Sequence, residues 1–150
     1  MTTRVIGVGN ADRGDDAAGL LAVRALSMRL PPGVEVAETD GEPARLIDLL
    51  GGVDRVILVD ASSARDRPGL VRRLNIEAVG DARCTTTSHR LGLPDAVLLA
   101  AALGIAPEAV VYTVEGQSFE PGAGVSPEVE RGIRIVARQI LREVRPTGLR

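Results

Sequence analysis

The sequence predicts one α/β domain over residues 1–150, built as three layers in which a mostly parallel, twisted sheet is flanked by helices on both faces. Apolar runs of strand length alternate with segments of helical periodicity, which favours parallel strands joined by helices. The runs are continuously rich in Val, Ile and Leu, as expected of strands covered on both faces. With 150 residues, 45% of them hydrophobic, the chain can bury one core but is too short for two domains.

The first half of the chain predicts strand, helix, strand, helix and strand. The first strand is a short apolar run that ends in glycines, and the helix after it has apolar residues at helical spacing until Pro31-Pro32-Gly33 interrupts it. "VEVAET" reads as the second strand, "ARLIDLL" as a short helix closed by two glycines, and "RVILVDA" as a buried strand. In chain order, the predicted ranges are 5–8, 20–30, 34–39, 44–50 and 55–61.

The second half predicts an edge strand, a helix, a buried strand and a final helix. The edge strand alternates in polarity and is rich in arginine, unlike the other strands. Pro94 suits the first turn of the helix that follows. The final helix starts at Pro127 with Ser126 as its N-cap, and its apolar positions recur every three or four residues. The predicted ranges are 69–79, 94–103, 109–116 and 127–144.

The composition argues against several classes of partner and chemistry. The net charge is −2, and the eighteen basic residues are all arginines spread along the chain, so neither nucleic acid nor a membrane is an expected partner. The absence of lysine excludes Schiff-base and P-loop chemistry. Cys84 is the single cysteine, which suits a reducing compartment, and no signal peptide or apolar span of about 20 residues stands out. We therefore expect a cytoplasmic protein, and a monomer is the default expectation for its oligomeric state.

Acidic residues follow the predicted parallel strands, where ligands bind in open α/β sheets. In chain order they are Asp15, Asp16, Asp40, Asp60 and Glu115. The only histidine, His89, lies in the loop "CTTTSHRLG" just before a predicted helix that can carry it to the same edge. Like charges this close repel unless a proton or a cation lies between them. An imidazole among carboxylates suits zinc, nickel or cobalt better than calcium or magnesium, which indicates an open metal site.

Each of these residues also has a plainer interpretation. Asp15 or Asp16 alone can cap a helix, Asp40 can belong to an ordinary turn, and His89 can be a hydrogen-bonded loop residue. Asp60 alone can cap a loop, and Glu115 can simply end a strand. A nucleotide-binding module that uses the glycines after the first strand is a further hypothesis. The glycine spacing GxGxxxxG does not meet the dinucleotide fingerprint, and two carboxylates at the helix start would repel a phosphate.

Five stretches in the same order resemble the hydrogenase maturation endopeptidases, which trim the large-subunit precursor of nickel–iron hydrogenases. They are "GVGNADRGDDAAG", "TDGEPARL", "RVILVDA", "SHRLGLPD" and "VEGQSFEPGAGVSPEVE". The resemblance implies that Asp16, Asp60 and His89 are metal ligands and that Asp40 lies beside the site. The sequence departs from the family at Asp12, where an aliphatic residue is usual, and at Glu42-Pro43, where a second glycine usually follows the Asp-Gly turn.

The resemblance also implies the activity. A hydrogenase large-subunit precursor is cut once near its carboxyl end after nickel insertion, and the protease recognises the nickel held by that substrate. The expected catalytic residues are Asp16, Asp40, Asp60 and His89, and another divalent metal is an alternative to nickel in vitro. The metal can polarise the scissile carbonyl and lower the pKa of a bound water, or it can only anchor the substrate while Asp40 acts as general base. A non-proteolytic, nickel-binding maturation factor of the same fold is the alternative function.

Overall fold

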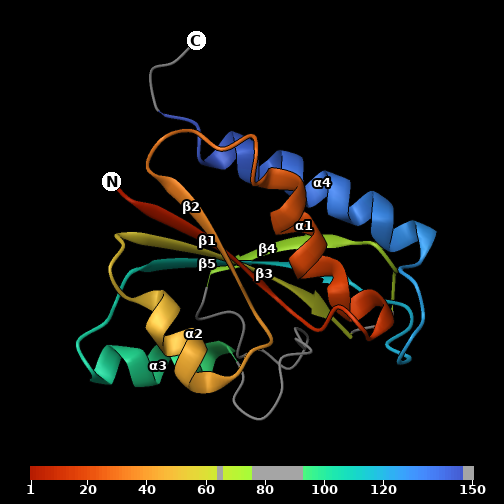
Figure 1. Cartoon of the computed structure of the whole chain (residues 1–150), viewed down its shortest axis with the longest axis horizontal. Coiled ribbons are helices and arrows are strands. Elements are labelled where there is room, and N and C mark those ends of the chain that lie inside the picture. Colours follow the sequence, from red (N-terminus) through yellow and green to blue (C-terminus); the bar gives the residue numbers. More distant parts are fainter. Residues whose placement is uncertain (64–65, 76–92, 147–150) are drawn as a thin grey trace.

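The computed structural model describes residues 1–63, 66–75 and 93–146, which form a twisted five-stranded sheet between two helical layers (Figure 1). The strand order is β2-β1-β3-β5-β4. Strands β1, β2, β3 and β5 are parallel, and β4 pairs antiparallel with β5 at one edge. The strands are β1 (Thr3–Val8), β2 (Val34–Thr39), β3 (Arg55–Ser62), β4 (Val71–Asn75) and β5 (Glu108–Glu115). The predicted mostly parallel sheet and its edge strand are confirmed, although residues 76–79 lie outside the described ranges.

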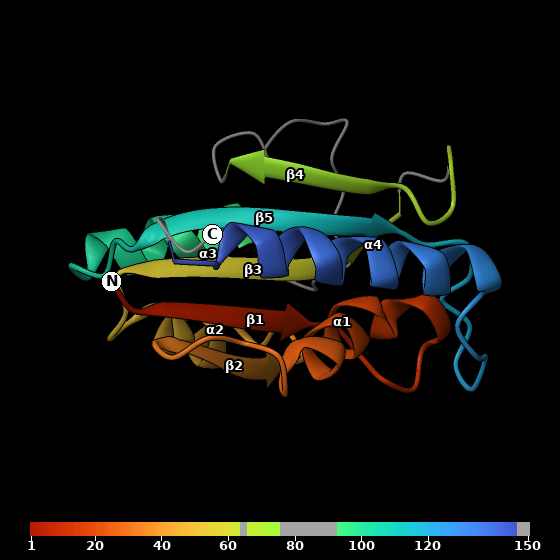
Figure 2. The same ribbon diagram turned by 90° about the horizontal axis from the view of Figure 1, so that it is seen from above.

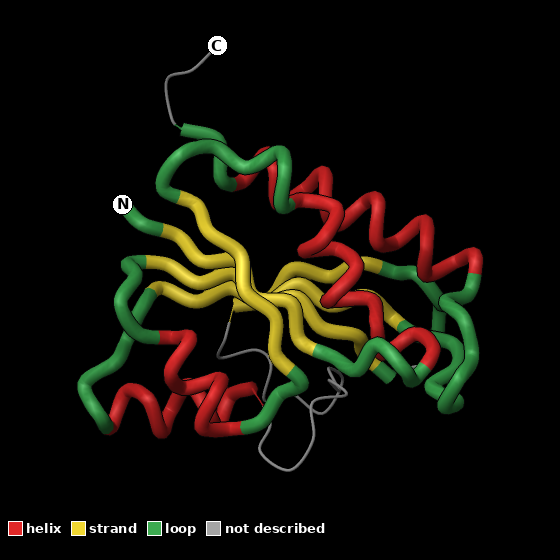
Figure 3. The backbone as a smooth tube through the Cα atoms, in the orientation of Figure 1, coloured by secondary structure: helices red, strands yellow, loops and turns green. Residues whose placement is uncertain are grey.

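Helices cover both faces of this sheet, as predicted (Figure 3). A short 3-10 turn, η1 (Gly14–Ala17), leads into α1 (Ala18–Leu26), which packs beside α4 (Pro127–Glu143) on one face. Helices α2 (Pro43–Leu50) and α3 (Leu93–Ala102) pack together on the other face. The view from above shows the long helix α4 lying along β3 and β5 (Figure 2).

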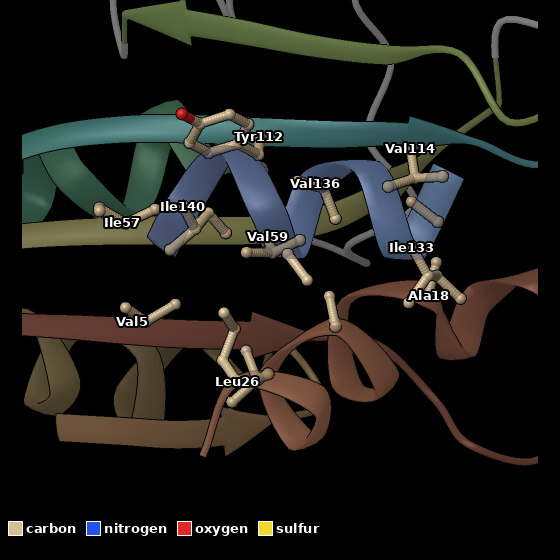
Figure 4. Close-up of a cluster of buried hydrophobic side chains, with 14 of the residues drawn as sticks. Val5, Ala18, Leu26, Ile57, Val59, Tyr112, Val114, Ile133, Val136 and Ile140 are labelled. Atoms are coloured by element: carbon tan, nitrogen blue, oxygen red, sulfur yellow. The ribbon is translucent and has the colours of Figure 1, made fainter. Parts of the chain in front are cut away.

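Alternation along the strands divides the buried side chains into two clusters. Val5, Ile57 and Tyr112 pack with α1 and α4 (Figure 4), whereas Ile6 and Leu58 pack with α2 and α3. Because successive strand residues point to opposite faces, the polar residues at the strand ends are also assigned to a face. Asp60 stands two positions after Leu58 and so belongs to the face covered by α2 and α3.

The first helix is shorter than its apolar pattern predicts. It ends at Leu26 instead of residue 30, and the N–H of Arg29 closes the turn on the carbonyl of Leu26. Met28, which the pattern counts as part of the apolar face, is 94% exposed. Met28 therefore gains no burial that would extend the helix, and Leu30 packs against the core from the segment after the helix end.

Glycines allow α1 to lie directly on the sheet. A Cβ atom on Gly7 would lie 2.6 Å from the carbonyl oxygen of Gly19, and a Cβ atom on Gly19 would lie 2.6 Å from the carbonyl oxygen of Val8. Both distances are well below van der Waals contact, so larger residues would push the helix off the strands. Backbone packing therefore accounts for these glycines.

Candidate functional site

The carboxyl ends of the four parallel strands lie along one edge of the sheet. Val8 of β1 is in register with Thr39 of β2, and Ser62 of β3 is in register with Glu115 of β5. Adjacent strands in a sheet lie about 4.8 Å apart, so residues that end or follow these strands are close neighbours. The predicted convergence of acidic residues is thus a property of the topology.

Asp16 and Asp60 are both buried at this edge. Asp16 lies in η1, which packs against β3, and only 3% of its surface is exposed. Asp60, near the end of β3, is fully buried, and its Oδ1 accepts a hydrogen bond from the N–H of Ala61 at 2.8 Å. Two carboxylates from distant parts of the sequence are therefore withdrawn from water on elements that touch.

Asp40 occupies the rim of the same edge and is exposed. The carbonyl of Thr39 accepts a hydrogen bond from the N–H of Gly9 at 3.0 Å, which holds the end of β2 beside the end of β1. Oδ1 of Asp40 accepts from the N–H of Glu42 at 2.9 Å, an interaction that orients the carboxylate. Since β1 lies between β2 and β3, Asp40 follows the strand on one side of β1 and Asp60 belongs to the strand on the other side.

His89 and Cys84 lie outside the described residues. His89 stands four positions before Leu93, the first residue of α3, and α3 covers the face to which Asp60 belongs. Within residues 1–63, 66–75 and 93–146, no three His, Cys, Asp or Glu side chains form a group able to hold a metal. The described residues thus supply two buried carboxylates, and the complete ligand set stays a prediction.

Asp15 does not cap the helix that follows it, which corrects one interpretation of the sequence. Its carboxylate accepts hydrogen bonds from the backbone N–H groups of Gln117, Ser118 and Ser126, in the loop between β5 and α4. Ser126 is the N-cap residue of α4 by position but makes no side-chain capping bond, and its hydroxyl is directed toward Asp15, to which it donates. The predicted N-cap position of Ser126 is confirmed, but neither side chain caps a helix, and the two bind each other instead.

Glu115 ends β5 as a buried residue. Its Oε2 accepts a hydrogen bond from the backbone N–H of Arg67, while Oε1 is buried without a hydrogen-bond partner among the described residues. The N–H of Gly69 also donates to the Glu115 carbonyl at 2.7 Å. Glu115 therefore holds the segment that precedes β4 against the end of β5.

Comparison with known proteins identifies the family. A family model described as hydrogenase maturation protease matches residues 22–143. The hydrogenase 2 maturation protease of Escherichia coli (strain K12) is 32% identical, with 99% of this chain and 94% of that protein aligned. The chain belongs to the hydrogenase maturation protease family.

Solved structures agree with this assignment. The hydrogenase maturating endopeptidase HybD from E. coli superposes with a TM-score of 0.84 at 29% identity, covering 99% of this chain and 94% of that one. The [NiFe] hydrogenase maturation protease HybD from Thermococcus kodakarensis gives a TM-score of 0.81 at 25% identity, covering 97% and 100%. The resemblance seen in the sequence is confirmed, and this maturation protease is a peptidase with the α/β fold of its relatives.

One departure of this protease from the family pattern has a structural explanation. Glu42 is the N-cap residue of α2, and its carboxylate accepts hydrogen bonds from the N–H groups of Ala44 at 3.1 Å and Arg45 at 3.0 Å. Pro43 follows in the first turn, where its missing N–H costs nothing. Glu42-Pro43 therefore starts a helix at a position where the family usually has a second glycine.

The other departure, Asp12, lies in the exposed loop after β1. Its carbonyl oxygen accepts a hydrogen bond from the N–H of Gly122 at 2.7 Å, and its N–H donates to the side-chain oxygen of Asn10. These are backbone interactions that do not require an aspartate side chain, and nothing in the structure explains the acid at this position.

None of the helices in the described ranges of the protease combines the length and the apolar composition needed to span a bilayer.

Proposed function

We propose that this protease removes a short C-terminal peptide from the nickel-loaded precursor of a nickel–iron hydrogenase large subunit. The observation that carries the proposal is the burial of Asp16 and Asp60 at the carboxyl edge of the sheet, on elements in contact. Buried carboxylates at close quarters are stabilised by a cation. The relatives named above are maturation proteases and endopeptidases, which supports a cleavage reaction.

Nickel belongs to the substrate in this proposal, and Asp16, Asp60 and His89 recognise it. Imidazole and carboxylate donors together suit a borderline ion such as nickel, and zinc or cobalt could take its place in vitro. Helix α3 ends beside the start of β5, so its first turn lies toward the carboxyl edge of the sheet (Figure 1). The position of His89 just before this turn supports its inclusion in the ligand set.

We assign to Asp40 the activation of the attacking water. It is exposed at the rim, where substrate and water have access, and its carboxylate is oriented by the N–H of Glu42. A bound divalent ion can polarise a carbonyl and acidify water. Asp40 would take the proton from that water as general base, and such groups contribute about 10²- to 10⁴-fold to rate.

The decisive experiment is mass spectrometry of a nickel-loaded large-subunit precursor after incubation with the purified protease. Wild-type protein should release one C-terminal peptide, and Asp16→Asn and Asp60→Asn should reduce the rate at least about 100-fold, because loss of even a group that supports a metal ligand costs about 10- to 100-fold. Asp48→Asn is the matched control, because Asp48 lies on α2 with 79% of its side chain exposed, and it should cleave as wild type does. Full cleavage by either folded site variant would refute the proposed roles.

The same experiment tests the alternative of a non-proteolytic maturation factor. If the wild-type protein binds nickel, or the nickel-loaded precursor, without releasing a peptide, the fold serves binding alone. A precursor lacking nickel should remain uncut when the metal is the recognition element. Cleavage of the nickel-free precursor would instead show that the protease recognises the polypeptide of the precursor and not its metal.

We also propose that the protease acts as a cytoplasmic monomer. The single cysteine, which cannot form an internal disulfide, supports a reducing compartment. Size-exclusion chromatography with light scattering checks the oligomeric state, with 15.7 kDa expected for one chain.

A further inference from the structure

Asp15 gathers an unusual number of hydrogen bonds for one carboxylate. Oδ2 accepts from the N–H groups of Gln117 at 2.7 Å and Ser118 at 3.0 Å, and Oδ1 accepts from the N–H of Ser126 at 2.8 Å. The Ser126 hydroxyl lies 3.2 Å from Oδ1 and 3.1 Å from Oδ2. Only 1% of the residue is exposed, so these donors replace water around a buried charge.

All the donors to Asp15 lie in one loop. We call this loop (residues 116–126) and the loop that includes η1 (residues 9–17) the paired loops. They are also joined by their backbones, since Asp15 N–H donates to the Ser118 carbonyl at 2.8 Å and Gly122 N–H donates to the Asp12 carbonyl at 2.7 Å. A Cβ atom on Gly14 would lie 2.5 Å from the Ser118 oxygen, which shows how closely the paired loops pack.

The arrangement requires a carboxylate at position 15. Both oxygens of an ionised aspartate accept hydrogen bonds, which matches N–H donors that approach from two sides. An asparagine of the same shape has one acceptor oxygen and one NH₂ group. Its NH₂ hydrogens would therefore face at least one backbone N–H, and two donors cannot bind each other. A buried donor left without a partner destabilises the arrangement, because it has given up its hydrogen bond to water.

We propose that Asp15 is a positioning residue for its neighbour Asp16. By holding the paired loops together, its carboxylate fixes the main chain of η1 and so sets the place of the Asp16 carboxylate at the edge of the sheet. The inference rests on the proposed function, because it assigns Asp16 to nickel recognition. It adds a residue that touches neither substrate nor metal but determines how well they are bound.

Calorimetric titration of the purified protein with nickel tests this role, together with kcat and KM for the precursor. Asp15→Asn should weaken nickel binding at least about tenfold, as losses of supporting hydrogen bonds around metal ligands do, while circular dichroism retains the native spectrum. Ser126→Ala removes only the hydroxyl donor and should change the affinity less than about threefold. Asp16→Asn defines the affinity that remains when the ligand itself is lost.

A matched control separates positioning from general loss of stability. Val144→Ala removes buried apolar surface at the opposite end of α4 and lowers stability without touching the paired loops. It should keep wild-type nickel affinity at a temperature where the protein is folded. If Val144→Ala weakens nickel binding as much as Asp15→Asn does, the positioning role is refuted.

A second variant decides the question if Asp15→Asn does not fold. Gly14→Ala leaves both aspartates in place but forces η1 away from Ser118, because Gly14 has a φ of +57° and no room for a Cβ atom. It should also weaken nickel binding. If folded Asp15→Asn binds nickel and cleaves with the affinity and kcat of the wild type, the positioning role is overturned and the proposed function stands. If only Gly14→Ala folds, the same result with that variant has the same meaning. If wild-type protein neither binds nickel nor cleaves, the proposed function fails and the positioning role with it.

Discussion

Adjacent residues of the same type have different surroundings at the start of the first crossover. Asp15 and Asp16 are both buried, yet the Asp15 carboxylate is occupied by donors from the loop between β5 and α4, whereas Asp16 lies in the turn that packs against β3. The sequence offered both residues as possible helix caps, and Arg13, the residue at the N-cap position, makes no side-chain capping bond either. Long-range hydrogen bonding determines the role of Asp15.

Gly19 provides a residue-scale prediction about the support of the site. A Cβ atom there would lie 2.6 Å from the Val8 carbonyl oxygen and would also conflict with the Val59 carbonyl oxygen. We expect Gly19→Ala to lower the free energy of unfolding by about 1–3 kcal/mol, because α1 must shift from the sheet. Urea denaturation measures this change.

The matched control for that prediction is Gly124→Ala. Gly124 is exposed in the loop before α4, and a Cβ atom on it would meet nothing within 4 Å. Its substitution should leave the unfolding free energy within about 0.5 kcal/mol of wild type. Equal effects of the two substitutions would show that close backbone packing does not account for Gly19.

At the scale of elements, the helices differ in how their ends are held by hydrogen bonds. Helix α2 has a local side-chain cap in Glu42, whereas Ser126, the N-cap residue of α4, makes no side-chain capping bond and donates its hydroxyl to Asp15. The last predicted turn of α1 does not form, and Met28 in it is almost fully exposed and gains no burial. Apolar periodicity therefore predicted the helices themselves better than their ends.

The cap of α2 gives a prediction at this scale. Glu42→Ala removes the acceptor for the N–H groups of Ala44 and Arg45 and should destabilise the protein by about 1 kcal/mol. Asp48→Ala on the same helix breaks only an exposed contact of 3.9 Å with Arg45 and should cost less than about 0.5 kcal/mol. Thermal unfolding of both variants checks the difference, and equal shifts would contradict the capping role.

At the scale of the whole molecule, one carboxylate near the end of α4 connects the helix to three strands. Glu143 accepts hydrogen bonds from Arg55 of β3, from the hydroxyl of Tyr112 on β5, and from Arg73 of β4 at 2.8 and 3.0 Å. Burial raises the pKa of Glu143, but hydrogen bonds from Arg73 and Tyr112 and the nearby arginine charges outweigh it, so its pKa lies below the usual value. Burial and the Glu143 carboxylate raise the pKa of Tyr112 to about 12.

This cluster predicts part of the acid sensitivity of the fold. Because the pKa of Glu143 is lowered in the folded state, its contribution is present above the unfolded value of about 4.5 and is lost as the pH falls through the folded value. Glu143→Gln should therefore cost about 2–3 kcal/mol at pH 7 and progressively less as the pH falls below the unfolded value of 4.5. Urea unfolding across this pH range measures the difference.

A control separates the Glu143 cluster from surface charge. Glu35 is paired with Arg4 but its side chain is more than half exposed, so Glu35→Gln should cost less than about 1 kcal/mol at any pH. A difference between wild type and Glu143→Gln that stays constant from pH 7 to 3.5 would show that the charge of Glu143 does not stabilise the fold.

The order and type of the elements followed from the sequence alone. Apolar runs and helical periodicity are local properties, and they predicted the parallel strands, the arginine-rich edge strand β4 and helices on both faces. Since parallel strands end at a common edge, their position in sequence also predicted that Asp16, Asp40 and Asp60 gather there. The family resemblance carried by these stretches is confirmed, whereas the role of His89 is still a prediction.

Only the tertiary structure decided which polar groups meet. The donors to Asp15 lie 102 to 111 positions away in the sequence, and Arg55 lies 88 positions from Glu143. Periodicity and capping patterns report which face of an element is buried and where it starts, but hydrogen-bond partners across such separations depend on how whole elements pack. For this reason the sequence predicted the edge of the sheet at which the proposed site lies, and only the packing of η1 with the loop before α4 gave Asp15 surroundings different from those of Asp16.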